Sequence, residues 1–196
     1  LSTAGSVEMV RKAKEEGLPV TAEATTHHFS LTDAACASYD PVFKVHPPLR
    51  TDEDVKAVKA GLADGTIDAI ATDHAPHTDH SKEKSFSEAP PGMLGLQTAF
   101  SITLEESGLD IHQIFSLMSW RPAVIAGIAD RHGMTLSPGS RANLCVIDLN
   151  ETWTVSGKSM ASLSSNTPYE GRRLRGYVRH TIQAGEAVVI DGEAQR

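Results

Sequence analysis

The stretch IDAIATDHAPH, residues 67–77, decides the fold predicted for this chain. Its first half is a short apolar run bounded by turn residues, which predicts a buried strand. Asp73 follows that run, and a polar loop rich in histidine comes next. In an α/β barrel, metal-binding and acid–base groups lie at the carboxyl ends of strands. An acidic strand end beside solvated histidines would give the same pattern, so these residues alone leave both interpretations open.

Helices and strands alternate in the sequence before this stretch. Ser6 is a suitable N-cap for a first helix, which Gly17 would end. Residues 18–25 then predict a strand, and Thr51 begins a second helix with acids in its first turn. The strand at 67–72 comes next. This alternation predicts a parallel sheet.

Histidines also occur between these elements. His27 and His28 follow the first predicted strand, where they could be ligands, although packing or solvation explains such pairs more often. Residues 43–50 contain two adjacent prolines, which fix an extended backbone. That stiffness would hold His46 and Arg50 in defined directions. A plain connector between strand and helix accounts for the segment equally well.

The loop of residues 74–92 is long, charged and without periodicity. Loops of this length inside a domain are usually functional or disordered. Its last residues, 89–92, are rigid and lack large side chains, so their backbone amides and carbonyls are accessible. Such groups suit recognition of an amide-bearing ring, and a simple turn before a helix is the alternative.

Three helices are predicted after this loop. The first spans about 94–106 and should turn Leu96 inward. Asp110 and Gln113 form the capping box of the second, and Pro122 lies in the first turn of the third. We expect these helices to serve packing rather than catalysis.

The pattern changes to β after residue 137. Turn residues separate segments of high β propensity, at 142–148, 153–155, 177–182 and 187–190. We therefore predict a boundary near residue 137, with residues 1–137 in an α/β domain and residues 138–196 in a small β-rich domain.

The composition is that of an ordinary globular protein. The chain has 196 residues, of which 40% are hydrophobic and 22% charged, and its net charge is -7. This charge argues against general binding to nucleic acid or to a membrane surface. Cys36 and Cys145 fit no metal spacing and indicate reduced thiols in a cytoplasmic protein. The chain opens without methionine at Leu1 and enters a helix almost at once, so a fragment or processed chain is expected.

Taken together, several segments are similar to the C-terminal half of a bacterial class I dihydroorotase, a family within the cyclic amidohydrolase superfamily. The similarity rests on motifs that recur in one order along nearly the whole chain: STAGS at 2–6, TAEATTHHF at 21–29, FKVHPPLR at 43–50, ATDHAPH at 71–77, APPGMLGL at 89–96 and NTPYEG at 166–171.

This resemblance implies a fold and a reaction. The fold would be α/β: the C-terminal part of a (β/α)8 TIM barrel, with its last strands and helices, plus a small β domain that belongs to a composite β-sandwich. The reaction would be the reversible cyclisation of N-carbamoyl-L-aspartate to L-dihydroorotate in pyrimidine biosynthesis. It would depend on one or two Zn²⁺ ions, because zinc lowers the pKa of water enough to provide hydroxide at neutral pH.

The resemblance also implies roles for five residues. Asp73 matches the aspartate that ends the eighth strand, a zinc ligand that is also the catalytic general acid and base. His77 matches a histidine that binds the substrate carboxylate, and Pro91 and Gly92 match the loop that binds the pyrimidine ring through its backbone. His46 stands where many members carry an asparagine that contacts substrate; an imidazole can still donate a hydrogen bond, but with a different reach.

Most zinc ligands of the family would lie upstream of this chain, which contains no His-x-His pair. One carboxylate would hold zinc weakly, because catalytic sites normally use three protein ligands. We therefore expect the chain alone to be inactive. The expected partners are the substrate, further copies of the chain in a homo-oligomer, and aspartate transcarbamoylase, which some family members bind.

Two alternatives stay open. The chain could be a non-catalytic relative that serves as an assembly partner. It could also belong to an enzyme for hydantoin, dihydropyrimidine or allantoin, although the motifs at 47–50 and 73–77 favour dihydroorotate.

Overall fold

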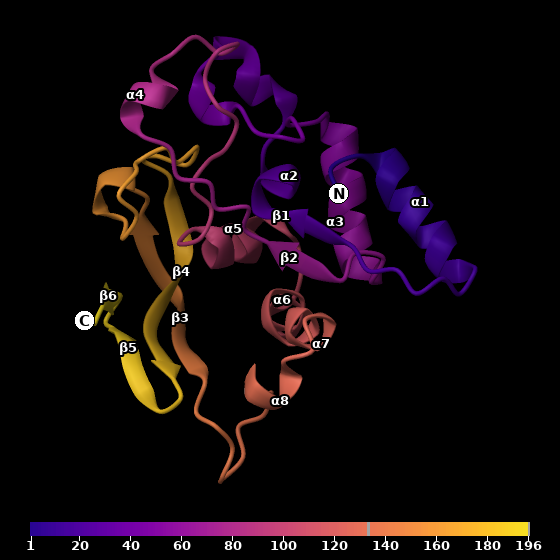
Figure 1. Cartoon of the computed structure of the whole chain (residues 1–196), viewed down its shortest axis with the longest axis vertical. Helices are drawn as coiled ribbons and strands as arrows, with labels where there is room; N and C mark the ends of the chain where they lie inside the picture. Colours follow the sequence, from indigo (N-terminus) through magenta and orange to yellow (C-terminus); the bar gives the residue numbers. More distant parts are fainter. Residues whose placement is uncertain (133, 196) are drawn as a thin grey trace.

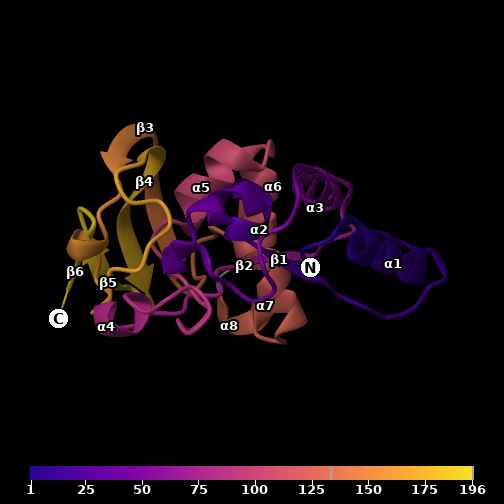
Figure 2. The same ribbon diagram turned by 90° about the horizontal axis from the view of Figure 1, so that it is seen from above.

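A computed structural model describes residues 1–132 and 134–195. Helices α1 and α3 lie at one side of the molecule, the short strands β1 and β2 lie next to them, and an antiparallel sheet lies at the opposite side (Figures 1 and 2). In chain order the elements are α1 (Ala4–Glu15), β1 (Glu23–Thr25), α2 (Thr26–Ser30), the 3-10 turns η1 (Asp33–Ser38) and η2 (Pro41–Phe43), α3 (Asp52–Asp64), β2 (Ala69–Ala71), α4 (Asp79–Lys82), α5 (Ala99–Glu106), α6 (Ile111–Phe115), the π-helical turn η3 (Ser116–Trp120), α7 (Arg121–Ile125), α8 (Ala129–His132), β3 (Leu144–Thr154), the 3-10 turn η4 (Gly157–Ser159), β4 (Arg173–Gln183), β5 (Glu186–Ile190) and β6 (Glu193–Ala194).

Strands β1 and β2 pair in parallel, as the alternation of elements predicts. Ala24 lies opposite Ile70, and both side chains are buried. β1 begins at Glu23, so the prediction of a strand that includes residues 18–22 is wrong. A strand exists only where a neighbour supplies ladder hydrogen bonds, and the ladder with β2 covers three residues.

Helix starts follow the capping signals, with one correction. Thr51 caps α3 and Asp110 forms a capping box with Gln113 at α6, as predicted. At α1, however, the N-cap is Thr3 rather than Ser6. Ser6 occupies the third helical position, where its amide donates to Thr3 Oγ1 at 3.1 Å, so it is the second partner of the same capping box.

The predicted helix over 94–106 begins five residues late, at Ala99. Residues 94–96 instead donate their amides to distant acceptors: Leu94 to the carbonyl of Asn166, and both Gly95 and Leu96 to Nδ1 of His74. Leu96 is 60% exposed, so the prediction that it faces inward is wrong. Contacts with residues far along the chain override the helical pattern here.

The sheet runs in the order β3-β4-β5-β6, with every pair antiparallel. β3 begins at Leu144, after the predicted domain boundary near residue 137, which stays a prediction. The sheet shares its core with the helical part: Leu174 and Val155 belong to the same buried cluster as Val58 and Ile102.

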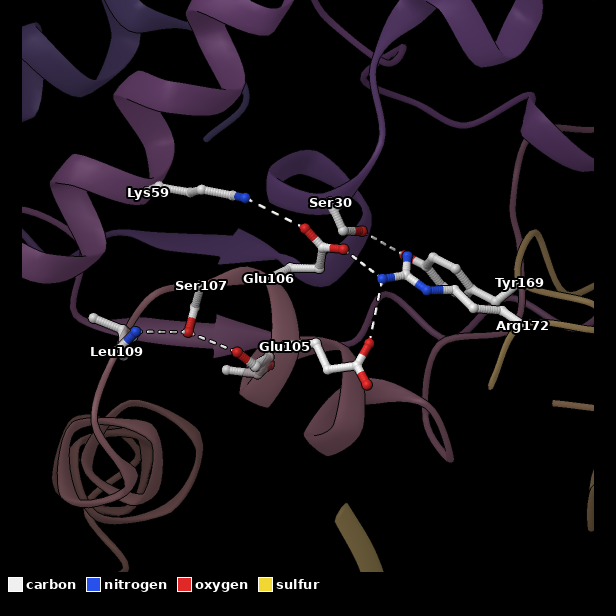
Figure 3. Close-up of polar contacts among 9 residues, drawn as sticks. Ser30, Lys59, Glu105, Glu106, Ser107, Leu109, Tyr169 and Arg172 are labelled. Carbon is white, nitrogen blue, oxygen red and sulfur yellow. Dashed lines mark hydrogen bonds and ion pairs between the residues drawn. The ribbon is translucent and has the colours of Figure 1, made fainter. Parts of the chain in front are cut away.

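A polar network reinforces the junction between the helices and the chain that enters β4 (Figure 3). Arg172 pairs with Glu106 of α5 and lies 3.4 Å from Glu105 Oε2, while Lys59 of α3 lies 3.4 Å from Glu106 Oε2. Next to this network, the hydroxyls of Tyr169 and Ser30 are 2.7 Å apart.

In the described part of the chain, no helix combines the length and the apolar character that crossing a membrane requires.

Candidate active site

Asp73 lies two residues beyond the end of β2, at the edge that the sequence predicts to be functional. Its backbone has φ +45°, a left-handed conformation that aspartate tolerates better than most residues. The carboxylate side chain is 46% exposed, and its nearest basic partner is Nε2 of His27 at 3.9 Å. The strand end and this turn together direct the carboxylate to a solvent-accessible position.

His27 and His28 lie in the single helical turn α2 that follows β1. Nε2 of His28 is 2.9 Å from the carbonyl oxygen of Pro47, which can only accept, so this nitrogen carries the proton. Nδ1 of His28 then accepts from the Thr25 hydroxyl at 2.6 Å, and the same hydroxyl oxygen accepts from Nε2 of His27 at 2.9 Å. These directions hold for a neutral His28, whose proton the Pro47 carbonyl places on Nε2.

Both imidazoles are neutral at pH 7, because the pKa of each lies below the usual value of 6.5. Burial, with a contribution from neighbouring His28, lowers the pKa of His27 to about 3, and burial also lowers the pKa of His28. A neutral His27 forms no ion pair with Asp73 although the two side chains are 3.9 Å apart. The nitrogens that face Thr25 and Pro47 are occupied, which favours packing over metal binding for this pair.

His77, Pro91 and Gly92 lie together. Nε2 of His77 is 3.0 Å from the carbonyl oxygen of Pro91. Gly92 has φ +134°, and a Cβ atom there would lie 2.8 Å from Nε2 of His77 and 2.7 Å from Cβ of Ala75. Only glycine fits both the backbone conformation and the close approach, so the loop and the histidine can meet.

Asn166 holds this cluster together, and the sequence reasoning did not single it out as a site residue. Its buried side chain accepts from the amide of His77 at 3.1 Å and donates to the carbonyls of Ala75 at 3.1 Å and Gly92 at 3.3 Å. Asn166 is 89 residues from His77 along the chain. No local pattern indicates such a contact; the only signal was the presence of Asn166 in the motif at 166–171.

His46 lies at the border of the cluster. Its neighbour Pro47 accepts the hydrogen bond from His28, and the carbonyl of Lys44 accepts from the amide of Gly92 at 2.8 Å. The imidazole of His46 is exposed and makes no hydrogen bond within residues 1–132 and 134–195. The structure thus brings His77, Pro91 and Gly92 into contact and places Asp73 four residues before His77. Within the described residues, His46 makes no side-chain hydrogen bond to any of them.

The donor set for a metal is incomplete in the described residues. No three side chains of His, Cys, Asp or Glu are grouped there as a metal site requires. The exposed carboxylate of Asp73 fits the role of one zinc ligand, since carboxylate oxygens bind zinc and no Lys or Arg among the described residues pairs with this group.

Comparison with known proteins places the chain in a family. The amidohydrolase family profile matches residues 4–188. A dihydroorotase of Streptomyces coelicolor is 50% identical over 197 residues, covering 98% of this chain and 46% of that protein, and one of Elusimicrobium minutum is 47% identical with similar coverage. The chain therefore spans about half the length of the curated relatives it matches.

Solved structures agree with this assignment. The L-hydantoinase (dihydropyrimidinase) of Arthrobacter aurescens superimposes with a TM-score of 0.92 at 29% identity, covering all of this chain and 45% of that one. A D-hydantoinase from Thermus sp. gives a TM-score of 0.88 at 26% identity. These similarities confirm the predicted α/β fold class, part of a barrel plus a small β domain. On the family profile and the fold together, the chain belongs to the amidohydrolase family.

Proposed function

We propose that this chain is the C-terminal part of a zinc-dependent dihydroorotase, which interconverts N-carbamoyl-L-aspartate and L-dihydroorotate. The observation that carries the proposal is the exposed carboxylate of Asp73, which lies at a strand end and pairs with no Lys or Arg within the part of the chain that the structure describes. Relatives named dihydroorotase at 44–50% identity support the choice of substrate.

Asp73 is the proposed carrier of the proton. In the ring-opening direction, water adds its oxygen to the ring carbonyl carbon, and its proton passes to the Asp73 carboxylate. The carboxyl group then delivers that proton to the ring nitrogen as the amide C–N bond breaks. Zinc, when bound with Asp73 among its ligands, would lower the pKa of water and polarise the carbonyl.

The loop cluster is the proposed binding surface for the substrate. The imidazole of His77 donates to a substrate carboxylate oxygen, in exchange for its contact with the Pro91 carbonyl. Pro91 has no N–H, so it can offer only its carbonyl oxygen to an N–H group of the ring, once His77 turns to the substrate. The buried Gly92 already uses its amide on Lys44, which leaves the second lone pair of its carbonyl oxygen for the ring. His46 is proposed as an additional donor from the facing segment.

The main alternative is a cyclic amidohydrolase with another substrate, which the similarity to hydantoinase structures supports at lower identity. The expected association with further copies of the chain and with aspartate transcarbamoylase is likewise a proposal.

The test is a hydrolysis assay on the complete natural gene product that carries this chain, with the zinc content measured. L-Dihydroorotate, hydantoin and dihydrouracil serve as parallel substrates. We expect turnover of dihydroorotate with a kcat/KM at least about 100-fold above the other two. Preference for hydantoin or dihydrouracil would replace the proposed substrate, and zinc-loaded protein without turnover of any of the three would contradict the enzymatic proposal. Stoichiometric zinc and turnover in the isolated chain of residues 1–196 would contradict the ligand assignment.

A further inference from the structure

The loop that carries Pro91 and Gly92 is fastened to a distant segment by a lysine to which the proposed reaction assigns no role. Lys82, at the end of α4, donates from Nζ to the carbonyl of Pro41 and to the carbonyl of Pro90, both at 2.9 Å. Pro90 directly precedes the two residues that are proposed to bind the ring. α4 and its loop lie beside the turns of residues 33–43 in Figure 1.

The environment of Lys82 fits a structural anchor rather than a solvated surface charge. The side chain is half-buried, and its burial, with a contribution from nearby Lys44, lowers the pKa of its ammonium to about 8. An ammonium gives up water only where other acceptors replace it. Here the two carbonyl oxygens are those acceptors, and hydrogen bonds from a charged donor are stronger than neutral ones.

Other contacts join the same two segments. Lys44 donates to the carbonyl of Ser87 at 2.9 Å, and its Nζ lies 5.8 Å from the centre of the Phe86 ring. The edge of Tyr39 meets Phe86 at a centroid distance of 5.9 Å, and the amide of Gly92 donates to the Lys44 carbonyl. Lys82 contacts both segments through one atom, so its removal would release two attachments at once.

We propose that Lys82 is a positioning residue, which fixes the carbonyl of Pro90 and thereby sets the orientation of the backbone at Pro91 and Gly92 for substrate binding. The inference rests on the proposed function for its effect on substrate, but its effect on the loop is independent of any reaction. Lys82 itself does not contact the reacting atoms.

The experiment compares three variants of the complete gene product. Lys82→Met keeps the aliphatic stem and removes the donor, and Lys82→Arg restores a donor able to reach two carbonyls. Lys84→Met is the matched control, because Lys84 lies in the same loop with an exposed side chain and makes no polar contact within the described residues. Each variant is assayed for kcat and KM with dihydroorotate and for hydrogen exchange over residues 85–96.

We expect Lys82→Met to raise KM about tenfold while kcat falls less than about threefold, the pattern of lost binding rather than lost chemistry. Lys82→Arg should recover most of this loss, and Lys84→Met should leave KM within about twofold of the parent value. Exchange over residues 85–96 should rise in Lys82→Met alone, with the rest of the chain unchanged.

Equal exchange in Lys82→Met and Lys84→Met would overturn the proposal, and so would a rise in exchange throughout the protein, which would mean a general structural role. These exchange outcomes are decisive even if the parent protein does not turn over dihydroorotate. A parent protein that does not turn over dihydroorotate would contradict only the proposed function.

Discussion

Two polar clusters of this chain, one around Asp73 and one around Arg172, use their charges in opposite ways. Around Arg172 each charged side chain has an oppositely charged partner, and the exposed fraction of every member is about a third or less. Asp73 is more exposed, at 46%, and its nearest basic neighbour is a neutral histidine. Paired charges hold elements together, whereas a carboxylate without a counterion is available to bind a metal or to move a proton.

Replacing Asp73 tests this contrast most severely. Asp73→Asn in the complete gene product should lower kcat for dihydroorotate about 10³-fold, or ~4 kcal/mol in activation free energy, because the amide cannot carry the proton. The urea midpoint should not change, since the carboxylate accepts no hydrogen bond from residues 1–132 or 134–195. Asp52→Asn, a similar change at an exposed surface pair, is the control and should leave kcat unaltered. Near-normal turnover in Asp73→Asn would remove Asp73 from its proposed role.

Asn166→Ala should have the next largest effect. The change leaves one amide and two carbonyls of the loop cluster without their partner, which predicts a loss of about 3 kcal/mol in kcat/KM. Faster hydrogen exchange at the His77 amide should accompany it. Asn150→Ala, at an exposed asparagine, serves as the control. If the two variants behave alike, the cluster does not depend on Asn166.

Arg172→Met tests the paired cluster. Removal of the Arg172 guanidinium takes away the ion pair with Glu105 and leaves Glu106 paired with Lys59 alone. The free energy of unfolding should fall by about 2 kcal/mol. Turnover per folded molecule should stay the same, in contrast to the Asp73 variant. The measurement is urea unfolding beside an activity assay. Arg173→Met, which removes two exposed hydrogen bonds to the Thr152 hydroxyl, should cost less than about 0.5 kcal/mol. An equal loss in both variants would refute the contribution of the network.

Replacement of Tyr169 should have the smallest effect on stability at neutral pH and a separate effect at alkaline pH. Tyr169→Phe loses the hydrogen bond to Ser30, at about 1 kcal/mol. Burial raises the pKa of the Tyr169 phenol to about 12, whereas an unfolded tyrosine titrates near pH 10. Between these values the unfolded state releases its proton first, so the stability contributed by Tyr169 is lost as pH rises above 10.

Urea unfolding between pH 9 and 11.5 measures this dependence. Stability of the parent should fall more steeply with pH than that of Tyr169→Phe. Tyr39→Phe, at a 73% exposed tyrosine, should follow the parent. Parallel curves for the parent and Tyr169→Phe would contradict the assigned pKa.

Local signals in the sequence predicted local structure well. The caps at Thr51 and Asp110 follow from residues close in the chain. The parallel pairing of β1 and β2 follows from the order in which helices and strands alternate. The late start of α5 could not be predicted in this way, because the competing partners of residues 94–96 are His74 and Asn166. Contacts that span tens of residues leave no periodic pattern.

The candidate site shows the same difference between local signals and long-range contacts. The sequence drew attention to Asp73 and His77, which lie together in one loop, and to the rigid backbone of residues 89–92, where the resemblance then singled out Pro91 and Gly92. The roles of these residues stay predictions. The arrangement of Thr25, His27 and His28 was not predictable, because the carbonyl that fixes their proton positions belongs to Pro47.

The side-chain amide of Asn166 has a practical consequence for protein engineering. Because this residue comes after β3 and yet supports the loops beside Asp73, the chain beyond residue 138 cannot be exchanged as a self-contained module. A chimera that takes its β sheet from another amidohydrolase would have to retain Asn166, because the loops that carry His77 and Gly92 would otherwise lose three hydrogen bonds.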